Sequence, residues 1–443
     1  MRIHPHVLIG TRGHDRVPCE MGWFAVPENR HAPGSRMIEL AFARIPSTSP
    51  DPGPPLVYLE GGPGASGLST WATQPRRYLC FLEFGDVIVL DQRGVGLSRP
   101  NLTGPFRLGL PLDRVVTRAE YLAEHLATTA ATAAFWRERG ADLDGYTTEE
   151  SADDVAALMA ALGYDTFRTA GGSYGSHLSL SVIRRHGERI ERSLIYAVEG
   201  PDDTYKLPSA TDRHLGRLAA LAAAAPELDG RAPDLTDLMA RVFERLREKP
   251  AEAGGVVIGE FDVKAVTASG MGFAPFLKKL PALFLAMAAG DFSWWAEHVR
   301  NLRTEPVANL MSTVMDCASG ATAERLRRIA REESLLDDLM NFPFPAIGQA
   351  IGGPDLGDAF RAPVVSGVPA LFMNGTLDGR TPETNALAVK EGFADSHFIL
   401  AENAAHQSVH NEPEVFDAVR DFMHGRPVTL TDVRLDFTFD RSP

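Results

Sequence analysis

The segment Gly171-Gly172-Ser173-Tyr174-Gly175 has the spacing Gly-x-Ser-x-Gly, in which a sharp strand-to-helix turn holds a serine hydroxyl out toward solvent. A chain with 40 glycines produces this spacing by chance, so the flanking residues must support it. Residues 166–170 are partly β-branched or aromatic and predict a strand, whereas 176–186 carry apolar residues on one helical face and predict a helix. Ser173 is therefore predicted to be a nucleophile.

A serine hydroxyl attacks a carbonyl only when a base removes its proton, and the base needs an acid to orient it. In enzymes with this turn the acid and then the histidine follow the serine along the chain. Asp378 follows the apolar segment 370–374 and His406 follows 397–400, so both lie at the carboxyl ends of predicted strands, where the sites of open α/β sheets form. His406 is predicted to be the base and Asp378 its orienting acid.

Other titratable residues compete for these two roles: His177, His397, His410, Asp395, Glu199 and Glu402. His397 falls within a predicted strand and His410 within the turn or helix that follows, while His177 points along the helix after the serine and is predicted to be structural. Asp395 precedes its strand, at the wrong end of the sheet for catalysis. The order and placement of Asp378 and His406 favour them over all of these.

Two glycine-bearing segments follow buried strands before the serine. Residues 60–67 stand where an acyl-transfer enzyme needs backbone N–H groups aimed at the developing oxyanion, so the amides of Gly62 and Tyr174 are predicted to form the oxyanion hole. Residues 91–96 lack the third glycine of a dinucleotide-binding fingerprint. Asp91 and Arg93 are accordingly predicted to be scaffold residues.

The strand and helix patterns alternate around Ser173, which predicts an α/β fold with a mostly parallel central sheet. Thr147 and Glu150 form a capping-box pattern at the start of the helix before the nucleophile strand. Residues 201–362 are rich in alanine and leucine with helical periodicity and predict a helical cap inserted into a core of 1–200 and 363–443. The alternation over 433–439 predicts an additional strand.

Composition limits the classes of protein and partner. The chain has 443 residues and a net charge of −14, which disfavours binding to nucleic acid or to anionic membranes. Its three cysteines form no Cys-x-x-Cys pair, and no metal-ligand spacing is present, so neither metal nor cofactor is predicted. The N-terminus shows no signal-peptide pattern and no apolar run is long enough to span a membrane, so a cytoplasmic enzyme is expected. The oligomeric state is left open.

Three motifs together resemble the proline iminopeptidase family of serine aminopeptidases: Glu60-Gly61-Gly62-Pro63-Gly64, residues 91–98 and residues 171–176. Similarity to its larger tripeptidyl aminopeptidase-like members extends through residues 363–369 and the Asp378 turn to His406. The resemblance implies an α/β-hydrolase fold with a helical cap inserted after the strand that follows the nucleophile. It also implies release of N-terminal residues, often proline, from short peptides, with cap carboxylates binding the free ammonium group.

Candidates for that ammonium site lie at the junction of core and cap: Glu199, Asp202 and Asp203, for which a solvated acidic turn is the alternative explanation. Glu60 departs from the resemblance, since relatives usually carry histidine or asparagine before Gly-Gly-Pro-Gly. Its carboxylate would make the mouth of the oxyanion loop more negative or pair with a basic group. Glu60 is therefore a further candidate for substrate binding.

The same catalytic groups hydrolyse esters and lactones, so a carboxylesterase or lactonase acting on an apolar small metabolite is the alternative function. Five cap aromatic residues would either line an apolar pocket or pack the cap: Phe273, Phe276, Phe284, Trp294 and Trp295. A catalytically silent binding protein is disfavoured, because no member of the predicted triad is missing.

Overall fold

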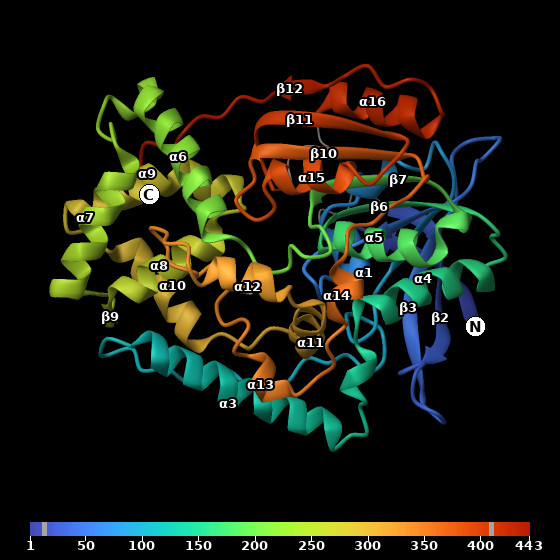
Figure 1. The fold of residues 1–443 in the computed structure, drawn as a ribbon, viewed down its shortest axis with the longest axis horizontal. Helices are drawn as coiled ribbons and strands as arrows, with labels where there is room; N and C mark the ends of the chain where they lie inside the picture. The colour runs from blue at the N-terminus through green and yellow to red at the C-terminus, as the bar shows by residue number, and fades with distance from the viewer. Residues whose placement is uncertain (11–15, 407–411) are drawn as a thin grey trace.

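The computed structural model describes residues 1–10, 16–406 and 412–443. In this part of the chain a ten-stranded sheet has the order β1-β2-β3-β5-β4-β6-β7-β10-β11-β12 (Figure 1). The first three strands are antiparallel: β1 Arg2–Ile9, β2 Arg16–Pro27 and β3 Met37–Ile45. The others run parallel to one another: β4 Leu56–Leu59, β5 Val87–Leu90, β6 Phe167–Ser173, β7 Ile190–Val198, β10 Ala370–Leu377, β11 Ser396–Ala405 and β12 Asp432–Arg434. The mostly parallel sheet predicted from the sequence is confirmed.

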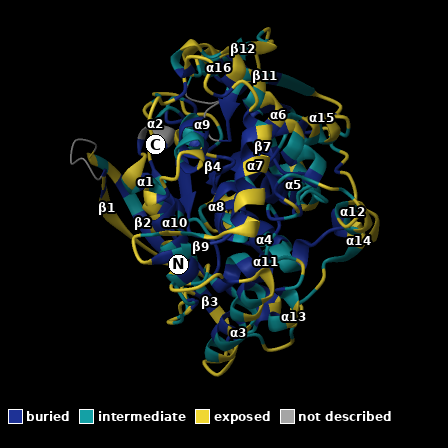
Figure 2. Cartoon of the chain, turned by 90° about the vertical axis from the view of Figure 1, so that its left-hand side faces the viewer, coloured by how far each residue is buried: buried dark blue, intermediate teal, exposed yellow. Residues whose placement is uncertain are grey.

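Helices cover both faces of this sheet. One face packs against α4 Thr148–Ala161, α5 Tyr174–His186 and α15 Glu383–Lys390, and the other against α1 Gly67–Thr73, α2 Arg76–Leu79 and α16 Pro413–Met423. In β5, Ile88 and Leu90 face the first layer while Val87 and Val89 face the second, and all four are buried. Burial of each such side chain stabilises the fold by roughly 1.5–3 kcal/mol. The central strands appear dark blue in Figure 2 for this reason.

Residues between β7 and β10 form a helical layer, most of which has its own apolar cluster, whereas the buried side chains of Leu310–Ser319 and Ile351 pack with the core cluster of the sheet. Its elements are α6 Pro208–Ala224, α7 Leu235–Glu248, the hairpin of β8 Ala251–Ala253 and β9 Val256–Ile258, α8 Glu260–Gly270, α9 Ala274–Ala288, α10 Ser293–Thr304, α11 Leu310–Ser319, α12 Ala323–Ile329, α13 Gly348–Ile351 and α14 Gly357–Arg361. Short 3-10 turns lie at Leu143–Gly145, Gly187–Arg189 and Pro226–Leu228. No strand of residues 201–362, all of which are described, joins the large sheet.

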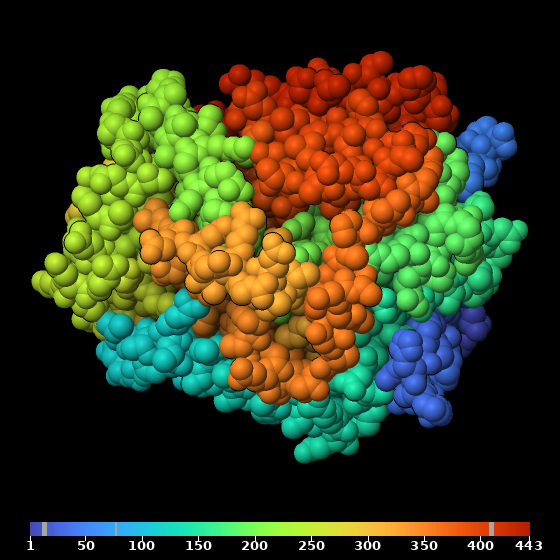
Figure 3. Space-filling model, viewed as in Figure 1, coloured from blue at the N-terminus to red at the C-terminus, as the bar shows by residue number. Residues whose placement is uncertain are grey.

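Helix α3, Arg118–Arg137, comes from the N-terminal part of the chain but packs with this layer. Figures 1 and 3 show it along the lower edge of the cap helices. Its Tyr121 hydroxyl donates to Asp262 at 2.6 Å, and Asp262 pairs with the fully buried Arg303 of α10 at 2.7 Å. The division into a core of 1–200 and 363–443 and a cap of 201–362 stays a prediction, to which the structure adds α3 on the cap side.

Two local predictions need correction. Thr147 caps α4, since its side chain accepts from the Glu150 amide, but the Glu150 carboxylate binds Arg30 rather than completing a capping box. The tail forms a strand only at Asp432–Arg434, where it pairs with β11. Beyond β12 the chain leaves the sheet and crosses to the cap. The alternating pattern continues there, but the backbone has no neighbouring strand with which to pair.

The tail ties the core to the cap. The Phe439 amide donates to Glu227 at 2.7 Å and the Asp440 amide to the Lys278 carbonyl at 2.9 Å. The Phe439 ring is 4% exposed and belongs to the apolar cluster of the cap. These contacts fasten the cap to the end of the core sheet.

We expect Phe439→Ala to destabilise the protein by about 3 kcal/mol, because truncating a buried aromatic ring leaves a cavity. Urea unfolding followed by circular dichroism measures this loss. Phe273→Ala is the matched control, since Phe273 is 49% exposed and its truncation should cost no more than about 0.5 kcal/mol. Equal stability of the two variants would contradict the tail's role.

Candidate active site

Ser173 ends β6 and Tyr174 begins α5. The Ser173 backbone has φ 57° and ψ −133°, a region that non-glycine residues rarely occupy. A Cβ atom at Gly175 would lie 2.1 Å from the Leu59 carbonyl oxygen, and one at Gly171 would lie 2.3 Å from the Gly175 carbonyl oxygen. The turn thus requires glycine on both sides of the serine, as the motif predicts.

Asp378 and His406 lie together at the carboxyl ends of β10 and β11. His406 Nδ1 lies 2.9 and 2.8 Å from the two Asp378 carboxylate oxygens. Burial alone would raise the pKa of Asp378, but its interaction with His406 and its hydrogen bonds with Thr381 hold the pKa below the ordinary value. An ionised Asp378 keeps the proton of His406 on Nδ1 and leaves Nε2 to act as the base.

Ser173 and His406 line one cavity of about 220 Å³. The hydrogen bonds of the described residues do not include one between Ser173 Oγ and His406 Nε2. Such bonds are often long in an unliganded enzyme and shorten when substrate binds. The structure therefore brings together the three side chains of the predicted triad, with the Asp–His half already formed.

The competing residues lie elsewhere. His177 is buried and contacts the Gly200 carbonyl and Ser319, as a structural residue would. His397 contacts the Leu430 carbonyl, and Glu402 pairs with Arg434. Asp395 contributes its carbonyl to the Ala370 amide at the opposite end of β10. His410 lies outside the described residues.

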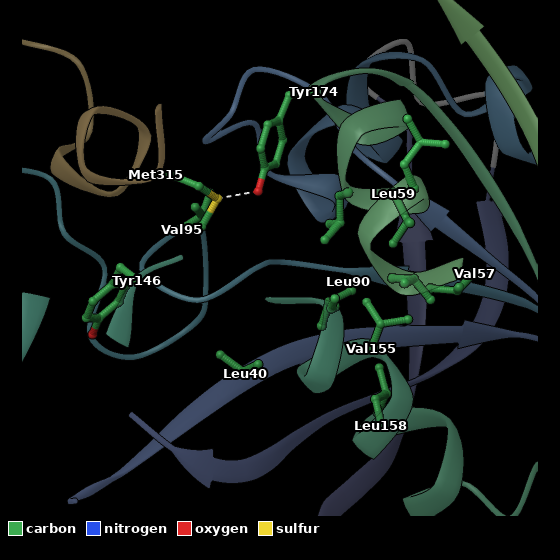
Figure 4. Packing of buried hydrophobic residues seen from close by; sticks show 14 of the residues in the cluster. Leu40, Val57, Leu59, Leu90, Val95, Tyr146, Val155, Leu158, Tyr174 and Met315 are labelled. Carbon is green, nitrogen blue, oxygen red and sulfur yellow. Dashed lines mark hydrogen bonds between the residues drawn. The ribbon is translucent and has the colours of Figure 1, made fainter. Parts of the chain in front are cut away.

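The predicted oxyanion donors flank the nucleophile. Gly62 lies in the loop after β4 and lines, together with Ser173, both cavities that meet at the serine. Tyr174 is the first residue of α5, where a backbone N–H has no acceptor within the helix. Its ring is buried and directed toward Met315 of α11, to which its hydroxyl donates (Figure 4). Tyr174 can therefore serve the oxyanion only through its backbone amide.

Asp91 connects the two glycine-bearing loops. Its carboxylate accepts from Ser66 Oγ at 2.7 Å, from the Leu68 amide at 3.1 Å and from the Leu97 amide at 2.8 Å. Arg93 is fully buried and pairs with Asp154 at 2.8 Å. Both are scaffold residues, as predicted from the sequence.

A larger cavity of about 300 Å³ lies between the core and the cap and also opens onto Ser173. Two carboxylates line it, Glu199 after β7 and Asp316 of α11. Glu199 pairs with Lys206 at 2.6 Å, whereas the contacts of the described residues include no hydrogen bond or ion pair of the Asp316 carboxylate. Burial, followed by the charge of Glu199, raises the pKa of Asp316 well above its ordinary value.

The other predicted binding residues are placed differently. Asp202 accepts from the Thr322 amide and hydroxyl at the start of α12, and Asp203 pairs with Arg325 at 2.7 Å. Neither lines the two cavities at Ser173. Glu60 is 3% exposed, accepts from the Tyr78 hydroxyl and lines the smaller cavity.

Several pocket residues escaped the sequence analysis: Lys206, Asp316, Arg380, Phe261, Phe342 and Phe344. Asp316 carried a usable signal, because it is the lone charged residue of the otherwise uncharged helix Leu310–Ser319. None of the five cap aromatic residues considered from the sequence lines the cavity. Phe284 and Trp295 pack the cap interior, the Phe276 ring contacts the Trp294 ring at a tilt, and Phe273 is exposed.

Within the described residues, no group of histidine, cysteine, aspartate and glutamate side chains is arranged to hold a metal ion. In that same part of the chain, no helix has both the length and the apolar character needed to cross a membrane.

We expect Thr381→Val to lower kcat by about tenfold. Thr381 Oγ1 donates to Asp378 Oδ2 at 2.8 Å and lies 3.2 Å from His406 Nδ1, so its loss frees the acid to turn away from the base. Steady-state kinetics measures the effect, with the exposed Thr384→Val as control. An unchanged kcat would show that Asp378 is held without the threonine.

We expect Asp316→Asn to stabilise the protein at pH 8, raising Tm by about 2 °C or more. A carboxyl whose folded pKa is raised favours the folded state below its unfolded pKa, and this contribution is lost as pH rises through the raised value. The gain from the variant should therefore shrink toward pH 4. Thermal unfolding across pH measures it, and the exposed Asp436→Asn should show no such trend. A pH-independent difference would contradict the charge-burial explanation.

Comparison with known proteins gives the same fold. A family model described as alpha/beta hydrolase fold matches residues 54–413. Tripeptidyl aminopeptidase from Streptomyces lividans is 28% identical over 204 residues, which cover 42% of this chain and 36% of that protein. Serine protease Hip1 from Mycobacterium tuberculosis is 28% identical over 191 residues, which cover 41% of this chain and 36% of that protein. The chain thus matches little more than a third of the length of these relatives.

Solved structures are more distant in sequence. A thermophilic esterase from Thermogutta terrifontis is 18% identical with a TM-score of 0.40, covering 91% of this chain and 98% of that one. The enol-lactonase from Burkholderia xenovorans is 14% identical with a TM-score of 0.39, and the match covers 87% of this chain and 97% of that one.

Proposed function

The chain belongs to the α/β-hydrolase fold family, and from that premise we propose that it is a serine aminopeptidase that releases N-terminal residues from short peptides. One observation carries the proposal: the cavity that opens onto Ser173 contains the carboxyl groups of Glu199 and Asp316, and Asp316 has no hydrogen-bond or ion-pair partner among the described residues. A free ammonium group is the cation that such a carboxylate would bind next to a scissile peptide bond.

The arrangement of these residues supports the following catalytic cycle. Ser173 Oγ attacks the carbonyl carbon while His406 Nε2 takes its proton, and Asp378 stabilises the imidazolium through Nδ1. The amides of Gly62 and Tyr174 receive the oxyanion. His406 then gives the proton to the leaving amine, which departs and leaves an acyl-enzyme on Ser173. Water, deprotonated by His406, hydrolyses that ester and restores the serine.

Asp316 is held where it can select an amine. Its helix α11 contacts the nucleophile turn through Met315, which packs against the buried Tyr174 ring (Figure 4). Binding an ammonium would remove the cost of leaving this carboxylate charged and unpaired. Glu199, already paired with Lys206, adds negative potential without needing a second partner.

The relatives named as a tripeptidyl aminopeptidase and a serine protease support peptides as the substrate class. The proposal includes a cytoplasmic location, a short-peptide or other small substrate, no nucleic-acid or membrane partner and no cofactor. The chain's net charge of −14 is consistent with this set of partners.

A specific observation favours a second candidate, a carboxylesterase or lactonase. Phe261, Phe342 and Phe344 line the same cavity as Ser173 and would accept an apolar acyl group. The two candidates differ in whether the substrate must carry a free amine.

We expect the protein to hydrolyse Pro-, Ala- and tripeptidyl-arylamides that carry a free amine with a kcat/KM at least about tenfold higher than that of their N-acetylated forms. The reason is that an ammonium–carboxylate contact contributes about 1.5–3 kcal/mol. Asp316→Asn should remove most of this preference by raising KM for free-amine substrates.

Ser173→Ala should abolish both turnover and labelling by a fluorophosphonate, while the exposed Ser69→Ala keeps both. Turnover restricted to p-nitrophenyl esters and blocked amides would establish the esterase instead.

A further inference from the structure

Four charged side chains line the cavity of about 300 Å³: Glu199, Lys206, Asp316 and Arg380. Glu199 and Lys206 neutralise one another at 2.6 Å. In the described part of the chain, neither the Asp316 carboxylate nor the Arg380 guanidinium makes a hydrogen bond or an ion pair. The cavity therefore presents one carboxyl and one guanidinium group, each without a hydrogen-bond or ion-pair partner among the described residues.

Arg380 is fixed in this position by the catalytic turn and by the cap. Its backbone amide donates to Asp378 Oδ1 at 2.9 Å. Its stem lies against Gly272 between α8 and α9, where a Cβ atom would come within 2.7 Å of Arg380 Cγ. The backbone and the first part of the Arg380 side chain are therefore held at the cavity that Arg380 lines.

Among the described residues the nearby Asp378 forms no direct ion pair with the Arg380 guanidinium, although its charge acts to raise the pKa of Arg380. Its two carboxylate oxygens already accept from the Arg380 and Thr381 amides and the Thr381 hydroxyl, and both lie within 2.9 Å of His406 Nδ1. Arginine stays charged even where burial lowers its pKa, as it does here. A planar guanidinium in a sheltered site most favourably binds a carboxylate, through two parallel hydrogen bonds.

Two cavities meet at Ser173 and offer separate places for the two halves of a substrate. His406, which must protonate the leaving amine, lines the smaller cavity with Ser173 but does not line the larger one. The leaving group would accordingly depart through the smaller cavity. Arg380 and Asp316 line the larger cavity, which would then hold the acyl group bound to Ser173.

We propose that the acyl group accepted by Ser173 is zwitterionic, with its ammonium bound by Asp316 and its carboxylate bound by Arg380. This inference rests on the proposed aminopeptidase function and narrows its substrate class. Two kinds of acyl group have this chemistry: an N-terminal glutamate or aspartate joined through its α-carbonyl, and a glutamyl group joined through its γ-carbonyl. Both place an amine and a carboxylate within a few bonds of the scissile carbonyl.

The test compares arylamides of α-glutamate, γ-glutamate, glutamine, alanine and proline. Glutamine is nearly isosteric with α-glutamate and lacks only the negative charge. We expect the better of the two glutamyl substrates to exceed the glutaminyl one in kcat/KM by at least about tenfold, and the α- and γ-linked arms identify which carbonyl is attacked.

Arg380→Gln should reduce the ratio of glutamyl to glutaminyl kcat/KM to about one, and Arg380→Lys should restore part of it, because lysine keeps the charge but not the planar geometry. The ratio cancels any general loss of activity caused by disturbing the Asp378 turn. Arg213→Gln is the matched control, since Arg213 is exposed and lines only a neighbouring cavity. It should leave the ratio unchanged.

The outcomes separate this inference from the proposed function. Hydrolysis of alanine and proline arylamides with no preference for either glutamyl substrate would overturn the zwitterion and leave the aminopeptidase standing. A ratio that survives Arg380→Gln would show that another group selects the carboxylate and would overturn the role of Arg380. Failure to hydrolyse any free-amine amide would overturn both.

Discussion

The contact between the nucleophile turn and the loop after β4 is the constraint on which the rest of the site depends. Gly175 lies so close to the Leu59 carbonyl that no side chain fits between them, and a Cβ atom at Gly61 would lie 3.2 Å from Ser173 Cβ. This packing holds Ser173 at a positive φ, which local preference alone would not maintain. It also sets the oxyanion loop beside the hydroxyl, so the nucleophile and the Gly62 amide are positioned by one set of contacts.

The acid and base are positioned by the cap as well as by the sheet. Leu377 and Ala405 immediately precede Asp378 and His406, and both belong to the apolar cluster formed mainly by cap residues. The His406 amide donates to the Gly272 carbonyl at 3.2 Å, across the boundary between core and cap. Because the tail fastens the same boundary through Phe439, the Asp–His pair rests on a cap tied down at both sides of the site.

Periodicity and motif spacing predicted the parallel sheet, the helical insertion and the order of Ser173, Asp378 and His406, because each depends on residues close in sequence or on fixed strand ends. They could not place Asp316 or Arg380 in one cavity, since that depends on how the cap packs against the core. Asp202 and Asp203 illustrate the same limit: an acidic junction is visible in the sequence, but the contacts that engage these carboxylates with Thr322 and Arg325 are not. The sequence also missed the cap contacts of α3, whose apolar face gives no hint of which layer it joins.

The charges around the large cavity balance in number but not in pairing. Glu199 and Lys206 form the only direct ion pair among the four charged side chains that line it, in a part of the chain that is fully described. Keeping Asp316 and Arg380 sheltered and unpaired costs folding free energy, and replacing both with apolar residues would be the stable solution for a protein that bound nothing there. A ligand with both charges would regain that energy in the bound state, whereas a ligand with only an amine would leave Arg380 unpaired. A substrate that satisfies both groups at once is therefore favoured.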